Sequence, residues 1–197
     1  WKDYRINIVD TPGHADFGGE VERILQMVDG AIVLVDAAEG PMPQTKFVVS
    51  KALKVGLRPI VAVNKIDKPE RRPDEVINEV FDLFANLDAT DDQLDFPILY
   101  GSAKQGWMNT EYENPTENMD SLFQMVVDHV PVPKVEEGPF RFLATTISSD
   151  PFLGRILTGR VSSGTIKPNQ SIKVLNRDGE LVEQTRVSKV LAFRGLD

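Results

Sequence analysis

The first 130 residues alternate short apolar runs with helical patterns, and this alternation narrows the fold more than any other feature. We expect strands at the apolar runs 5–9, 31–35, 59–63 and 96–100. Apolar residues recur at helical spacing over 17–28, 44–55, 74–87 and 115–130. Strands alternating with amphipathic helices favour a mostly parallel sheet with helices on both faces. The sequence therefore predicts an α/β domain over residues 1–130.

The pattern changes after residues 131–139, a stretch with three prolines that we interpret as a linker. No helical pattern follows it. We expect strands at 140–148, 154–162, 170–175 and 184–190. Short turn sequences join them, and Asp178-Gly179 is a strong hairpin signal. Residues 140–197 are therefore predicted to form a partial antiparallel β-barrel.

Composition excludes several classes of protein. There is no cysteine, which rules out disulfides and thiolate metal sites. No apolar run approaches the roughly 20 residues of a membrane span, so we expect a cytoplasmic protein with no membrane partner. The net charge is −8, but residues 139–197 alone carry +4. The basic part is the better candidate for nucleic-acid contact, although an ordinary solvated surface explains its charges equally well.

The stretch Asp10-Thr11-Pro12-Gly13-His14 follows the apolar run 6–9. A strand that ends in Asp-x-x-Gly is the pattern with which GTPases sense the γ-phosphate of GTP. We expect Asp10 to reach Mg²⁺ through a bound water, and the Gly13 N–H to meet the γ-phosphate. A His directly after this glycine resembles the translation-factor branch of GTPases. The resemblance implies that His14 acts in catalysis by positioning or polarising the attacking water. The alternatives are a helix-capping Asp10 and a structural His14.

Two further loops follow apolar runs in the order expected for guanine recognition: Asn64-Lys65-Ile66-Asp67 and Ser102-Ala103-Lys104. Guanine presents two neighbouring N–H donors, and one carboxylate, that of Asp67, can accept both. Adenine lacks this pair and would leave a buried charge unpaired, so Asp67 is expected to select GTP over ATP.

The other residues of these two loops also receive nucleotide-binding roles. The Lys65 stem is expected to cover the face of the base, and the Ala103 N–H to donate to guanine O6. Asn64 is expected to tie its loop to the phosphate loop. Ser102 belongs to the second loop, and Lys104 either packs over the base or is simply exposed to solvent.

A phosphate-binding Gly-x-x-x-x-Gly-Lys-[Ser/Thr] sequence does not occur among the 197 residues. GTPases need this loop, because its backbone N–H groups and its Lys hold the phosphates. We therefore expect the chain to be an internal piece of a longer GTPase and to be inactive by itself.

The chain resembles translational GTPases, and among them the BipA/TypA family. The general features are the three motifs above and Gly40-Pro41-Met42-Pro43-Gln44-Thr45. The more specific feature is the run at 86–97, Asn-Leu-Asp-Ala-Thr-Asp-Asp-Gln-Leu-Asp-Phe-Pro.

The resemblance implies a ribosome-associated protein that uses Mg²⁺ and hydrolyses GTP to GDP and phosphate. Such proteins are implicated in translation regulation, large-subunit assembly and stress adaptation. It also implies a P-loop GTPase domain, a barrel of the translation-factor domain 2 type, and ribosomal RNA and proteins as partners. The candidate RNA contacts in the barrel are Arg155, Arg160, Lys167, Lys173 and Lys189.

Two alternatives stay open at this point. The chain could be a nucleotide-independent module that binds ribosomal RNA or protein, or part of a LepA-type or elongation factor G-type GTPase. The oligomeric state is open. Asp36 is interpreted as structural, and the aromatic residues within 107–118 have no predicted role.

Overall fold

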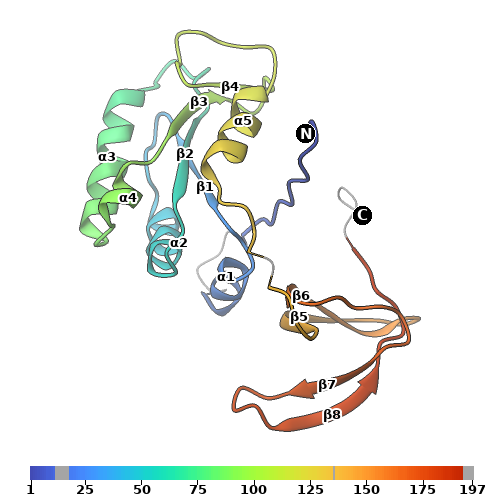
Figure 1. The fold of residues 1–197 in the computed structure, drawn as a ribbon. Coiled ribbons are helices and arrows are strands. Elements are labelled where there is room, and N and C mark those ends of the chain that lie inside the picture. Colours follow the sequence, from blue (N-terminus) through green and yellow to red (C-terminus); the bar gives the residue numbers. More distant parts are fainter. Residues whose placement is uncertain (12–17, 135, 193–197) are drawn as a thin grey trace. The chain divides into compact units, whose positions relative to one another are not determined.

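The computed structural model describes residues 1–11, 18–134 and 136–192, in two compact units (Figure 1). The first unit is Trp1–Pro133 and the second is Lys134–Asp197. The division lies within the predicted linker 131–139. Each unit is described by itself below.

A four-stranded sheet organises the first unit, in the order β1-β2-β3-β4. Its strands are β1 (Ala31–Asp36), β2 (Pro59–Asn64), β3 (Ile98–Ser102) and β4 (Trp107–Asn109). The first three are parallel, and β4 is antiparallel to β3. Strand β2 is buried from Pro59 to Val63, as its unbroken apolar run predicts for a strand covered on both faces. The predicted mostly parallel sheet is thus confirmed.

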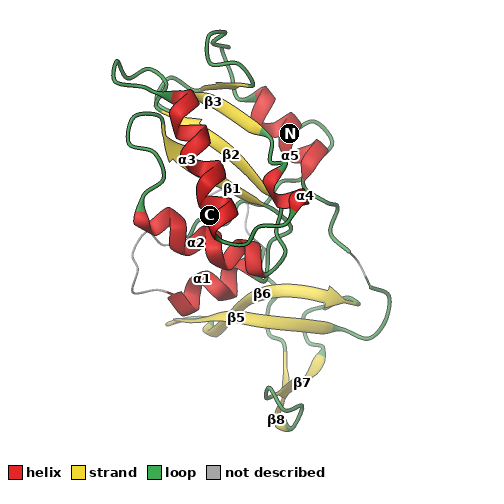
Figure 2. Ribbon diagram, turned by 90° about the vertical axis from the view of Figure 1, so that its left-hand side faces the viewer, coloured by secondary structure: helices red, strands yellow, loops and turns green. Residues whose placement is uncertain are grey.

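The helices of the first unit lie on both faces of this sheet. They are α1 (Gly18–Leu25), α2 (Pro43–Lys54), α3 (Pro73–Asn86), α4 (Asp91–Leu94) and α5 (Asp120–His129). Helices α2 and α3 cover one face and α5 covers the other (Figure 1), and α2 and α3 lie in front of the sheet in Figure 2. Alternate residues of β2 serve the two cores: Val61 and Val63 face α2 and α3, whereas Ile60 and Ala62 face α5.

The predicted strand at 5–9 is wrong. Residues 5–11 are neither helix nor strand, and the side chain of Ile8 is 80% exposed. Among the described residues no strand pairs with this segment, and an extended segment becomes a strand only when a neighbour takes up its N–H and C=O groups. The pattern of apolar residues identified the run at 5–9, but a local pattern does not show whether a neighbouring strand is present to pair with it.

The predicted helix 115–130 is wrong at its start, because α5 begins at Asp120. The preceding residues bond to β4 instead: the Thr116 hydroxyl donates to the carbonyls of Met108 and Asn118, and the Met108 N–H donates to the Asn118 carbonyl. The predicted helix 17–28 is observed as α1, which ends at Leu25. Its first residue, Phe17, lies outside the described residues.

The second unit contains two antiparallel hairpins, consistent with a partial barrel. The strands are β5 (Arg141–Asp150), β6 (Gly154–Ser163), β7 (Ser171–Leu175) and β8 (Leu181–Arg186). The predicted Asp178-Gly179 turn joins β7 to β8, and Gly179 has φ +83°, a value that favours glycine. The strand expected at 184–190 is wrong at both ends, since β8 begins earlier and stops at Arg186.

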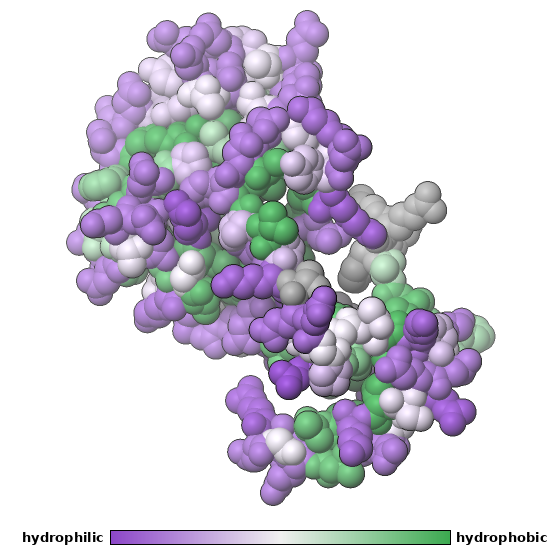
Figure 3. All heavy atoms as spheres, in the orientation of Figure 1, coloured by the Kyte–Doolittle hydropathy of each residue, from purple (hydrophilic) through white to green (hydrophobic). Residues whose placement is uncertain are grey.

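Large apolar side chains of the second unit reach its surface, where green patches interrupt the purple in Figure 3. Ile147, Phe152 and Val182 are 71%, 96% and 64% exposed. Two-stranded hairpins bury little of their own apolar surface, so this exposure follows from the topology. Within the described ranges, no helix is both long and apolar enough to cross a membrane.

Candidate functional site

The predicted guanine loops lie together at one edge of the sheet. Parallel strands bring their carboxyl ends to the same side, where ligands of open α/β sheets bind. Strand β2 ends at Asn64 and runs into Lys65–Asp67, while β3 ends at Ser102 and runs into Ala103 and Lys104. The strand register also places Asp36, the last residue of β1, directly beside Asn64. Three consecutive strands thus deliver polar side chains to one place.

The side chain of Asn64 connects the two loops. Its Oδ1 accepts the Lys65 N–H at 2.8 Å and the Ala103 N–H at 2.9 Å. The backbone adds a further link, since the Ile66 N–H donates to the Gly101 carbonyl at 3.1 Å. The Ala103 N–H, which we predict to meet guanine O6, is therefore bonded to Asn64 in this structure. A base at this position would share that donor with Asn64 or displace it.

Asp67 is exposed, and its carboxyl accepts a hydrogen bond from Ser102, whose side chain is fully buried. The hydrogen bond from Ser102 lowers the pKa of the Asp67 carboxyl, and the charges of Lys104 and Lys68 act in the same direction. The group is therefore an ionised acceptor at neutral pH. An exposed carboxylate with one fixed hydrogen bond retains capacity for two N–H donors, which is what guanine selection requires. Lys104 is exposed, and its charge acts on Asp67.

Lys65 adopts a left-handed backbone conformation, with φ +63°. Its ammonium group pairs with Asp36 Oδ2 at 2.8 Å, although half of its side chain is exposed. The hydrogen bond from Lys65 to Asp36 raises the pKa of Lys65. The ion pair holds the ammonium end of this side chain in place, and the aliphatic stem lies between that end and the loop.

Asp36 has more polar partners than sequence reasoning assigned to it. Its Oδ1 accepts the N–H groups of Ala38 and Glu39 at 2.8 and 3.3 Å, and its Oδ2 accepts Lys65 and Lys68 at 2.8 and 3.0 Å. Burial opposes ionisation of Asp36, yet these hydrogen bonds together hold its pKa well below the ordinary value. The only sequence signal was its position at the end of a strand next to the one that carries Asn64.

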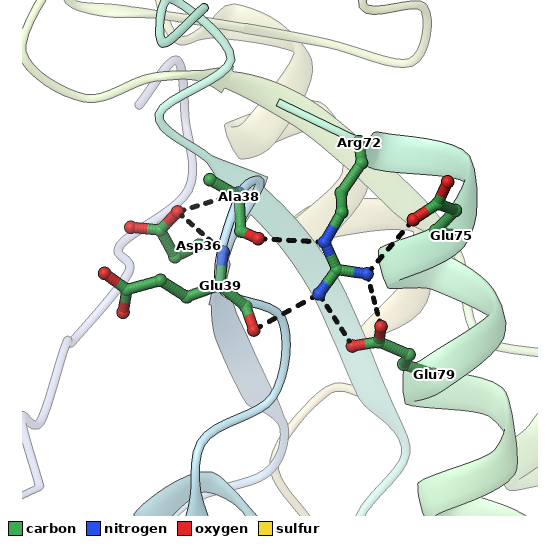
Figure 4. Close-up of polar contacts among 6 residues, drawn as sticks. All are labelled: Asp36, Ala38, Glu39, Arg72, Glu75 and Glu79. Carbon is green, nitrogen blue, oxygen red and sulfur yellow. Dashed lines mark hydrogen bonds and ion pairs between the residues drawn. The ribbon is translucent and has the colours of Figure 1, made fainter. Parts of the chain in front are cut away.

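Arg72 holds the same loop from its other side (Figure 4). Its guanidinium donates to the carbonyls of Ala38 and Glu39 at 2.9 and 3.4 Å, and it pairs with Glu79 and Glu75 of α3. The loop between β1 and α2 is thus fixed to the guanine loop through Asp36 and to α3 through Arg72. Arg72 has no sequence signal beyond its basic neighbour Arg71.

Comparison with known proteins now adds to this geometry. The family described as "Elongation factor Tu GTP binding domain" matches residues 1–132. This chain belongs to that family. Three curated relatives share the name "Large ribosomal subunit assembly factor BipA": those of Escherichia coli, Haemophilus influenzae and Buchnera aphidicola are 52%, 53% and 50% identical to the chain. Each match covers all of this chain but 32% of the relative, so the chain spans about a third of their length.

The predicted resemblance to the BipA/TypA family is confirmed by these relatives. They match over both units, including the second unit, which the elongation factor Tu family match does not reach. The same names favour the BipA type over the LepA-type and elongation factor G-type alternatives.

The γ-phosphate motif expected of an elongation factor Tu-type domain, residues 10–14, lies only partly within the residues that the structure describes. Asp10 is exposed within the irregular segment 5–11, whereas Gly13 and His14 lie outside the described residues. In the described part of the chain, no three acidic or histidine side chains gather into a group that could hold a metal ion. A single carboxylate fits Mg²⁺ only where nucleotide phosphates and water complete the octahedral shell. The chemistry of Asp10 is compatible with that arrangement.

Two of the aromatic residues that lacked a predicted role, Trp107 and Tyr112, lie beside the loop that contains Asp67. Arg71 donates to the Ile66 carbonyl at 2.8 Å and lies over the ring of Tyr112, 6.0 Å from its centre. Trp107 is buried against the core. Together with Asp67 these residues line a hollow of about 380 Å³. A larger hollow of about 600 Å³ includes none of the predicted site residues in its lining.

Proposed function

We propose that the protein binds guanine nucleotides through Asn64–Asp67 and 102–104, and that it hydrolyses GTP to GDP and phosphate. The observation that carries this proposal is the exposed, ionised carboxylate of Asp67, which accepts a hydrogen bond from Ser102. Its loop is joined to the loop 102–104 by the hydrogen bond between Asn64 and Ala103. Membership of the elongation factor Tu GTP-binding domain family supports it. In this proposal Lys65 covers the base, Ala103 meets O6, and Lys104 lies beside the base.

For hydrolysis we propose roles for three residues of the γ-phosphate motif. Asp10 holds Mg²⁺ through a water, the Gly13 N–H meets the γ-phosphate, and His14 positions the attacking water. When bound, Mg²⁺ would neutralise charge on the nucleotide phosphates.

We propose the ribosome as partner, with contacts to large-subunit RNA and protein, in the cytoplasm. The name of the relatives, large ribosomal subunit assembly factor, supports this proposal. Five of the basic residues of the second unit are the proposed RNA contacts: Arg155, Arg160, Lys167, Lys173 and Lys189.

The first test is calorimetric titration of the full-length protein with GDP and with GTP·Mg²⁺, with ATP as the control nucleotide. Guanine-selective binding supports the proposal. Equal binding of ATP and GTP overturns the proposed guanine selection. No binding of either nucleotide overturns the proposal and favours a nucleotide-independent module. We also propose that residues 1–197 alone bind weakly, because no phosphate-loop sequence occurs among them.

The base assignment has its own test in Asp67→Asn. The amide replaces one acceptor oxygen by a donor, so affinity for GDP is expected to fall and xanthosine diphosphate to be preferred. Glu70→Gln is the matched control, since it neutralises an exposed carboxylate three residues along the same loop. Unchanged GDP affinity in Asp67→Asn would refute the role of this residue.

A further inference from the structure

Asp36 occupies a position that the guanine-binding residues do not explain. It belongs to none of the predicted site motifs, yet it lies beside Asn64 in the sheet and contacts the Lys65 side chain of the guanine loop. Its own side chain is only 10% exposed, whereas those of Lys65 and Lys68 are 52% and 35% exposed. The carboxylate of Asp36 is therefore held in place by its surroundings, whereas the side chains of Lys65 and Lys68 have room to change conformation.

The two oxygens of Asp36 have separate tasks. Oδ1 accepts two N–H groups of its own loop, from Ala38 and Glu39, and thereby fixes the orientation of the carboxylate. Oδ2 accepts both lysine ammonium groups. Arg72 holds the carbonyls of the same two loop residues, so the backbone that carries the carboxylate is fixed on both sides (Figure 4).

The ion pair also determines where the Lys65 stem can lie. A lysine stem has many rotamers, and ordering it on binding costs conformational entropy when nothing holds its end. Here the backbone is held by Asn64, which accepts the Lys65 N–H, and the ammonium is held by Asp36. With both ends fixed, the stem is ordered before a ligand arrives, and less ordering is left for binding.

We propose that Asp36 is a positioning residue for guanine recognition: it anchors Lys65, with Lys68 beside it, so that the Lys65 stem is placed in advance against the base. The inference rests on the proposed function, because it assigns the base to the loop that contains Asp67. Asp36 touches no nucleotide in this scheme and acts through Lys65 alone.

The test is Asp36→Asn in the full-length protein, with GDP affinity measured by calorimetry. The amide oxygen can still accept the Ala38 and Glu39 N–H groups, but the charge that holds Lys65 is gone. Loss of one charge-assisted contact predicts about tenfold weaker GDP binding. Glu70→Gln is the matched control: it neutralises an exposed carboxylate that follows both lysines in the chain and, among the described residues, forms an ion pair with neither. GDP affinity is expected to stay within about twofold.

A double variant separates positioning from a merely structural effect. If Asp36 acts through Lys65, then Asp36→Asn combined with Lys65→Gln should bind GDP no more weakly than Lys65→Gln alone. Additive losses, or wild-type affinity in Asp36→Asn, overturn the inference. Failure of the wild-type protein to bind GDP overturns the proposed function instead.

A variant at the other partner of the ion pair, Lys65, tests the inference even if Asp36→Asn does not fold. Lys65→Met keeps an apolar stem but removes the ammonium that Asp36 holds. It is expected to lose affinity for GDP by about the same factor as Asp36→Asn. Wild-type affinity in Lys65→Met overturns the inference, because a covering stem would then need no anchor.

Discussion

Gln93 offers a quantitative test of the packing in the first unit. It is 5% exposed, and its Nε2 donates to the carbonyls of Leu53 and Leu57, both at 3.0 Å. These carbonyls belong to the end of α2 and the turn after it, where helix carbonyls lack partners within the helix. Its Oε1 accepts the Thr90 N–H at 3.0 Å and completes a capping box. One side chain thus satisfies three backbone groups in two elements.

Gln93→Leu keeps the approximate volume and removes all three bonds. The Leu53 carbonyl keeps the Gly56 N–H as a partner, at 3.0 Å, so its loss is small. The Leu57 carbonyl and the Thr90 N–H lose the contacts described above. A buried group left without a partner costs about 1–3 kcal/mol. Leu57 is buried, whereas Thr90 is exposed and water can replace Gln93 at its N–H, so the free energy of unfolding is predicted to fall by about 1–3 kcal/mol.

Urea unfolding followed by tryptophan fluorescence measures this change in the right unit, because both tryptophans, Trp1 and Trp107, belong to the first unit. Gln44→Leu is the matched control: it makes the same chemical change at an exposed position in the first turn of α2 and should alter stability by less than about 0.5 kcal/mol. If the two variants differ by less than about 0.5 kcal/mol, the bonds of Gln93 do not stabilise the fold as argued.

Three further outcomes are expected. Gly40→Ala should destabilise the first unit by about 2 kcal/mol, because Gly40 has φ +76° and a Cβ there would clash with Glu79 Oε2. Gly56 has a similar φ of +80° but open space around it, so Gly56→Ala should cost only about 1 kcal/mol in the same urea assay. The pKa of Asp36 is lower in the folded protein than its ordinary value of 3.8, so ionisation of this carboxyl stabilises the fold above that pH, and the contribution is lost as pH falls through the folded value. Below about pH 4 the free energy of unfolding of the wild type should therefore fall more than that of Asp36→Asn. Parallel pH profiles of the two proteins would contradict this. In the full-length protein His14→Ala should abolish ribosome-stimulated GTP hydrolysis while GTP binding persists, and equal stimulated rates would exclude the proposed role.

Much of the first unit was predictable from local pattern. Apolar runs such as 59–63 predicted strands, and helical spacing over 74–87 predicted α3, because burial on one face leaves a periodic trace in the sequence. The boundaries and the small elements were not predictable. Helix α4 and strand β4 are too short to show a period, and α5 begins late because residues 116–118 bond to a strand nearby in space.

The sequence by itself determined the type and order of the loops: an acidic residue, Asp67, in the first predicted guanine loop, and a Ser-Ala pair at the end of the next strand. Only the tertiary structure decided what holds them. Asp36 is 29 positions from Lys65 in the chain, and Gln93 is 40 from Leu53. Each pair meets because strands and helices fold back side by side. Partners of this kind leave no spacing pattern in the chain, since their geometry comes from the packing of elements and not from the period of any one of them.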